Sequence, residues 1–134
     1  YAHWEQVENN WNAVCCGNVG STALLLLEEG ATKKKLLERI RYALETYYLG
    51  GFGMDGACQE GLGYWVYGFT YFTLFALAQR EYDPSVDLMS SEKVDAIAHF
   101  QMEIQEALIR WDLPVVWQII IVIFDFQIQH MRRS

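Results

Sequence analysis

A cluster of glycines between residues 50 and 63 is the sequence feature that most constrains the fold. Six of the chain's ten glycines lie there, at positions 50, 51, 53, 56, 61 and 63. Glycine reaches positive φ without steric cost and lets other groups approach the backbone closely, so this segment predicts a long loop. An aromatic run follows it directly: Tyr64, Trp65, Tyr67, Phe69, Tyr71 and Phe72. The loop therefore delivers its two acids, Asp55 and Glu60, together with several phenols, to the start of a helix.

Apolar residues recur at helical spacing on both sides of this loop, which predicts four helices. They cover about residues 11–29, 32–49, 64–80 and 91–110. The expected caps are the Asn9–Asn10 pair for the first helix, Thr32 for the second and Ser90 or Ser91 for the fourth, while Gly30 is expected to end the first. Because the third helix is apolar nearly all round, we expect it to be buried on both sides.

These helices predict an all-α domain over residues 1–110, built from antiparallel helix hairpins, because no alternating apolar and polar segment occurs before residue 113. Residues 111–134 form a separate apolar tail rich in Val, Ile and Phe. By β-propensity the tail suits a strand, and a buried helix or an altered terminus are the alternatives.

Composition and charge narrow the possible partners. The chain has 134 residues, 52% of them hydrophobic, and a net charge of −7, which argues against a nucleic-acid partner. Its longest apolar run, 115–126, contains Gln118 and Asp125 and is shorter than the ~18 to 20 residues that cross a membrane, so no membrane partner is expected. The basic cluster of Lys33, Lys34, Lys35, Arg39 and Arg41 is interpreted as a solvated helix face.

The three cysteines and three histidines show no disulfide framework and no metal-ligand spacing, so neither a metal nor another cofactor is expected. Cys15, Cys16 and Cys58 are expected to be reduced and partly buried. No signal peptide is visible, but the chain begins with Tyr1 rather than Met, so the compartment stays open between cytoplasmic and periplasmic or secreted.

Two segments carry a family resemblance. DGACQEGLGYWVYG resembles the second signature block of the heparinase II/III-like polysaccharide lyases, DG-x-x-x-EG-x-GYW-x-YG. Residues 9–29, NNWNAVCCGNVGSTALLLLEE, resemble the first block, an NNWN-x-VC helix start. The blocks stand in the family's order, and the resemblance extends over about residues 4–101. It implies part of an (α/α) toroid, an acidic polysaccharide or oligosaccharide as substrate, and a longer parent chain whose absence would promote self-association.

Enzymes of that family cleave the bond next to a uronic acid by β-elimination, which requires a base, an acid and a group that stabilises the uronate carboxylate. The resemblance implies Tyr64 as the acid and possibly the base. It implies Asn10, with Asn9 as the alternative, as the carboxylate donor beside an electropositive helix start. Glu60 could hold a substrate hydroxyl, orient Tyr64 or act as an acid if burial raises its pKa.

The aromatic residues Trp11, Trp65 and Tyr67 are expected to contribute a sugar-stacking wall or packing. Related lyases often have histidine after the asparagine, where this chain has Trp11, so the base stays unassigned. Two alternatives remain open: a non-catalytic glycan-binding or scaffold module, and a glycoside hydrolase that uses Glu60 and Asp55 as a carboxylate pair.

Overall fold

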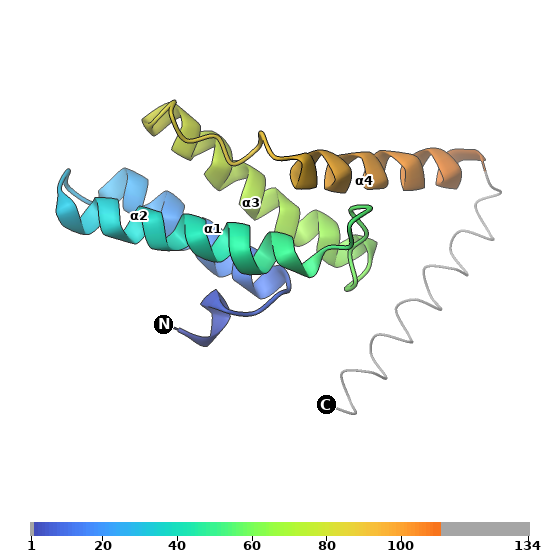
Figure 1. The fold of residues 1–134 in the computed structure, drawn as a ribbon, viewed down its shortest axis with the longest axis horizontal. Coiled ribbons are helices and arrows are strands. Elements are labelled where there is room, and N and C mark those ends of the chain that lie inside the picture. Colours follow the sequence, from blue (N-terminus) through green and yellow to red (C-terminus); the bar gives the residue numbers. More distant parts are fainter. Residues whose placement is uncertain (1, 111–134) are drawn as a thin grey trace.

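The computed structural model describes residues 2–110, so the apolar tail and the predictions made for it lie outside the described residues. The described part is mostly helical and contains no strand, which confirms the all-α prediction for residues 2–110 (Figure 1). Its long helices are α1 (Asn10–Leu26), α2 (Ala31–Ala43), α3 (Leu62–Tyr82) and α4 (Glu92–Arg110). Shorter turns are η1 (His3–Glu5), the π-helix η2 (Leu44–Tyr48) and η3 (Leu49–Gly51).

Two of the predicted helix caps are present. The Asn9 side-chain oxygen accepts a hydrogen bond from the backbone N–H of Trp11 at 3.0 Å, which starts α1. In the same way, the Ser91 hydroxyl accepts from the backbone N–H of Val94 at 3.2 Å at the start of α4. Each cap satisfies a first-turn amide that has no partner inside its helix.

The predicted boundary between the first two helices is wrong. Helix α1 already ends at Leu26, and Gly30 stands before α2 as its N-terminal cap with φ of 155°. Thr32 is the second residue of α2 rather than its cap. A positive φ of this kind favours glycine, so Gly30 serves the turn into the second helix and not the end of the first.

The expectation of a solvated basic helix face is wrong for Lys33. Its side chain is only 4% exposed, and its amine donates to the backbone oxygen of Leu24 at 3.1 Å and to Glu29 at 2.6 Å. The amine also lies 4.7 Å from the centre of the Tyr82 ring. A buried lysine needs such partners, and Leu24 lies in the last turn of α1, where carbonyl groups lack helical partners. Lys33 therefore closes the C-terminal end of the neighbouring helix.

Helix α1 packs against both α2 and α3, and Figure 1 shows the three as neighbours while α4 extends beyond one end of them. Small residues set the close approach of α1 and α3. A Cβ atom at Gly17 would lie 2.8 Å from the backbone oxygen of Tyr71, and one at Gly20 would overlap the ring of Phe75. The two glycines thus allow α1 and α3 to approach closely.

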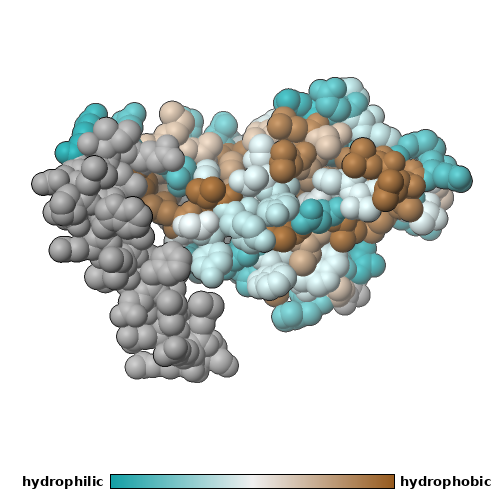
Figure 2. Space-filling view, turned by 180° about the vertical axis from the view of Figure 1, so that it is seen from behind, coloured by the Kyte–Doolittle hydropathy of each residue, from teal (hydrophilic) through white to brown (hydrophobic). Residues whose placement is uncertain are grey.

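Helix α3 is covered on one flank only by the described residues. Phe72 and Phe75 are fully buried, whereas Val66 is 49% exposed and Leu74 58% exposed. The expectation of burial on both sides is therefore wrong for residues 2–110, because α1 covers one flank and no other described helix covers the opposite one. Figure 2 shows that brown apolar patches are exposed on the face of the molecule that is turned away in Figure 1. None of the helices within residues 2–110 combines the length and apolarity needed to cross a membrane.

Helix α4 is held through the glycine-rich loop. The Lys93 amine donates to the backbone oxygens of Phe52 and Gly53, each at 2.7 Å. Gly56, with φ of 87°, lies against the backbone of Ala96, where a Cβ atom would overlap the carbonyl group. Val94 and Ile97 of α4 are buried.

We predict that Gly17→Val lowers the free energy of unfolding by about 1–3 kcal/mol, because the added atoms meet the backbone of Tyr71 and overpack the contact between α1 and α3. Chemical unfolding followed by circular dichroism measures the change. Gly50→Val is the matched control, since a Cβ atom at Gly50 meets nothing within 4 Å, and it should change stability by less than about 0.5 kcal/mol. Equal losses in both variants would contradict the close approach at Gly17.

Candidate functional site

Two hydrogen bonds to one carboxylate join the glycine-rich loop to the start of α1. One oxygen of the Glu60 carboxylate accepts from the backbone N–H of Asn10 at 2.6 Å, and the other accepts from the Asn10 side-chain N–H at 2.7 Å. These residues are 50 positions apart and belong to the two different segments that carry the family resemblance. The fold thus brings the candidate residues Asn9, Asn10 and Glu60 together at one helix end.

The loop that presents Glu60 is built from tight turns. The Asp55 side chain accepts from the backbone N–H of Ala57 at 3.0 Å, and Gly53 donates to the backbone oxygen of Ala57 at 2.9 Å. Gly61, with φ of 92°, then leads into α3. The contacts of Asp55 are therefore those of a residue that closes a turn.

Burial and hydrogen bonding shift the pKa of Glu60 in opposite directions. Burial raises the pKa of this carboxyl above its usual range, and the two hydrogen bonds from Asn10 oppose the shift without cancelling it. The acidic side chain at the electropositive start of α1 is the chain's own Glu60. Asn10 is only 7% exposed and points toward Glu60, not outward toward solvent.

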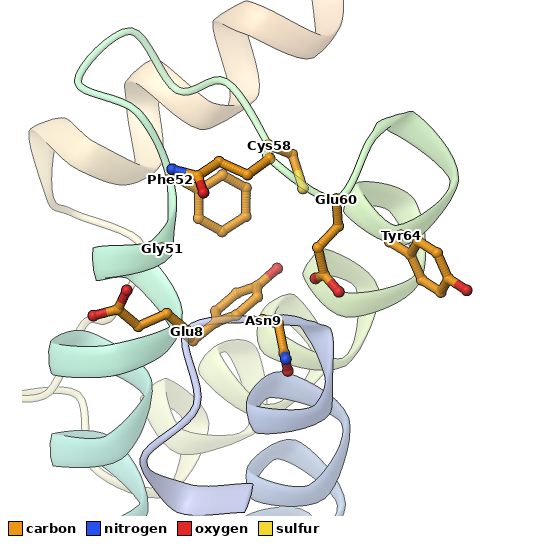
Figure 3. A pocket seen from close by; sticks show the side chains of 9 residues that line it. Glu8, Asn9, Gly51, Phe52, Cys58, Glu60 and Tyr64 are labelled. Atoms are coloured by element: carbon orange, nitrogen blue, oxygen red, sulfur yellow. The ribbon is translucent and has the colours of Figure 1, made fainter. Parts of the chain in front are cut away.

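A small cavity of about 10 Å³ lies beside Glu60. Figure 3 shows Asn9, Cys58 and Glu60 around it, with Tyr64 at its edge. The hydroxyl group of Tyr64 is turned away from the Glu60 carboxylate in this view. The complete lining is Glu8, Asn9, Tyr48, Gly51, Phe52, Cys58, Gln59, Glu60 and Tyr64.

The three candidate aromatic residues occupy different environments. Trp11 is 63% exposed on α1, one residue beyond Asn10. Tyr67 is also exposed, and its pKa is raised mainly by the neighbouring Tyr71, whose ring packs edge-on against it. Trp65, in contrast, stacks on Phe69 with ring centres 4.8 Å apart. Trp11 and Tyr67 are thus open to a ligand, and Trp65 takes part in packing.

Sequence reasoning missed one polar residue of this site, Tyr48. In the sequence it falls within the second predicted helix, and nothing there distinguishes its phenol group from a packing residue. In the structure its side chain is 2% exposed and lines the cavity with Glu60. The glycine content of the loop and the motif spacing could reveal Glu60, but nothing in the sequence indicated the π-helical turn that places Tyr48 there.

The described residues contain no group of three or more His, Cys, Asp and Glu side chains that could hold a metal ion. Comparisons with protein-family models, with curated proteins and with solved structures found no match for this chain.

We predict that Glu60 makes the free energy of unfolding depend on pH. Because its pKa is raised in the folded chain, the folded state keeps this proton at pH values where the unfolded state has lost it. The free energy of unfolding of the native chain should therefore fall relative to that of Glu60→Gln as the pH rises from about 4 toward 7. Urea unfolding at a series of pH values measures this difference.

Glu103→Gln, on the exposed face of α4, is the control for removal of one carboxylate. The pKa of Glu5 is lowered by its hydrogen bonds from Arg39, so Glu5 contributes the opposite slope, but it does so equally in both proteins and cancels in the difference. A difference that stays constant or grows with pH would contradict the raised pKa of Glu60.

Proposed function

We propose that this chain is part of a polysaccharide lyase that cleaves uronic-acid glycans, of the heparin, alginate or a related type, by β-elimination. The observation that carries the proposal is the Asn10–Glu60 contact, which joins the two motif segments at one helix start. The antiparallel helix arrangement expected for part of an (α/α) toroid is included in this proposal. The neighbouring exposed Trp11 offers a flat apolar surface of the kind on which sugar rings stack.

The proposed reaction assigns one step to each group. A base removes the proton from the carbon next to the uronate carboxylate, and the electron pair forms a carbon–carbon double bond as the bond to the leaving oxygen breaks. Tyr64 then protonates that oxygen. The second side-chain N–H of Asn10 donates to the uronate carboxylate, where negative charge builds up during proton removal.

Glu60 acts in this proposal as the positioning residue for Asn10. Its two oxygens accept from the backbone N–H and the side-chain N–H of Asn10, so Glu60 fixes the orientation of the side-chain amide whose second N–H would reach the substrate. The base is not assigned to a residue, since Trp11 stands at the position where related lyases often have histidine. Either Tyr64 itself or the remainder of the parent chain supplies the base.

A non-catalytic glycan-binding module is the second candidate. It is favoured by the hydrogen bonds that Asn10 already gives to Glu60, because the carboxylate donor of a lyase must be available to substrate. The hydrolase alternative gains no such support, since the Asp55 carboxylate is engaged in closing the turn at Ala57.

We predict that Tyr64→Phe in the full-length parent protein lowers turnover of a uronic-acid polysaccharide by about 10²- to 10⁴-fold, the usual contribution of a general acid or base. The ultraviolet absorbance of the unsaturated uronate product measures turnover. Stability should fall by no more than about 0.5–1.5 kcal/mol, since one hydroxyl group is removed. Tyr71→Phe, a half-buried tyrosine further along α3, is the matched control and should retain activity.

Near-normal turnover of Tyr64→Phe together with a clearly lower melting temperature would make Tyr64 a packing residue. Cleavage without an unsaturated product would favour a hydrolase. Glycan binding by the parent protein without any cleavage would favour the binding module.

We also predict that the isolated chain self-associates and shows little or no lyase activity. The apolar side chains exposed on α3, with Leu25 and Leu26 at the end of α1, leave surface that a larger toroid would cover. Analytical ultracentrifugation over a range of concentrations measures the association. A monomer that turns over substrate would contradict the assignment of this chain to part of a larger toroid.

A further inference from the structure

Tyr48 carries a buried polar atom without a protein partner. Its side chain is 2% exposed, yet its hydroxyl group makes no hydrogen bond to any other residue of the described part. Buried tyrosine hydroxyl groups normally have a partner, because leaving one unpaired costs about 1–3 kcal/mol. The position of this hydroxyl group therefore calls for a partner other than the surrounding side chains.

Several contacts fix the hydroxyl group beside the Asn10–Glu60 pair. A Cβ atom at Gly68 would lie 3.1 Å from the Tyr48 hydroxyl oxygen and 3.1 Å from the Cβ atom of Asn10, so both groups rest on the bare backbone of this glycine. The Tyr48 ring packs edge-on against Phe52, with ring centres 5.2 Å apart. The hydroxyl group is thus held in place from α1, α3 and the loop.

Tyr48 and Glu60 both line the cavity, and its volume is about 10 Å³. One water molecule needs roughly 10–15 Å³ measured in this way, so the space suits a single water and no larger ligand. Each Glu60 oxygen accepts one hydrogen bond from Asn10, and a carboxylate can accept about four in total, so Glu60 has capacity for another donor.

We propose that one ordered water molecule occupies this cavity, accepts a hydrogen bond from the Tyr48 hydroxyl group and donates one to the Glu60 carboxylate. Tyr48 is then a positioning residue for Glu60, and the helix start receives a third fixed polar group. Burial, followed by the nearby Cys58 and Glu60, raises the pKa of Tyr48, which keeps its hydroxyl group protonated as a donor. The proposal holds whether or not the chain acts on glycans.

The variant Tyr48→Phe tests this link in the isolated chain, with Tyr42→Phe, an exposed tyrosine on α2, as the control. The titration of labelled glutamate side chains is followed by NMR, and Glu60→Gln identifies the Glu60 signal. Glu8, Cys58 and Tyr64 are the other titratable groups that line the cavity, and Glu8 is distinguished by the same assignment. Loss of the water-mediated donor should move the Glu60 titration to higher pH and lower the melting temperature.

A Tyr48 hydroxyl group without a partner would give a different result. If the hydroxyl group has no partner, Tyr48→Phe removes an unpaired polar atom, so the melting temperature stays or rises and Glu60 titrates as in the native chain. That result would overturn the proposal. Tyr42→Phe should leave both quantities unchanged.

Water–protein nuclear Overhauser effects in the unaltered chain give a second test that does not depend on how the variant folds. We expect a long-lived water signal at the Tyr48 ring protons next to the hydroxyl group. Absence of any long-lived water at these protons, in spectra that detect other buried groups, would also overturn the proposal.

Discussion

The hydrogen bonds between Glu60 and Asn10 are the interaction on which the rest of the structure depends. They connect the first helix with the loop that precedes the third, over 50 residues of sequence. Removing the carboxylate would take away the partner of two Asn10 donors at the start of a helix. Because the same loop also holds α4 through Lys93, the contact fixes the start of α1 and the position of α4 together.

Both ends of α1 are completed by side chains from other segments. Glu60 occupies its electropositive start, and the buried amine of Lys33 donates to a carbonyl of its last turn. Charges placed in this way complement the helix dipole, and partial burial strengthens the effect. An ion pair between Glu5 and Arg39 at 2.6 Å joins η1 to α2, and Asn12 donates to the backbone oxygen of Glu5 at 2.9 Å. The central helix is therefore held by polar contacts at its ends and by apolar packing along its length.

Local patterns predicted much of this fold. Helical periodicity and polar caps located all four helices, and Asn9 and Ser91 cap them as their chemistry suggests. The errors concern residues whose role is set by distant neighbours. From the sequence alone Lys33 resembles a surface lysine, because its contact with a carbonyl of α1 depends on how the two helices pack. The sequence around Gly30 fits the end of one helix as well as the start of the next.

In the candidate site, too, local sequence indicated individual residues, while contacts between distant residues could not be predicted. Motif spacing indicated Asn10 and Glu60 separately, but their direct contact could not be derived, because it depends on how the loop turns at Gly56 and Gly61. Burial likewise decided between Trp65, which is packed, and Trp11, which is open, although both are tryptophans next to motif residues. Tyr48 was beyond sequence reasoning, since its position depends on a change of helix type.

The π-helix at Leu44–Tyr48 has a consequence for insertions and deletions in this chain. A π-turn accommodates about one residue more than an α-helical turn, so it behaves as a single-residue insertion absorbed within a helix. Loss of one residue from this turn could restore an ordinary α-helix and leave the hydrophobic stripe of α2 intact. If the same residues instead took ordinary α-helical geometry, the side chains after them would rotate by about 100° relative to that stripe, and Tyr48 would no longer face the cavity. The length of this turn, as much as the identity of its residues, determines what lies beside Glu60.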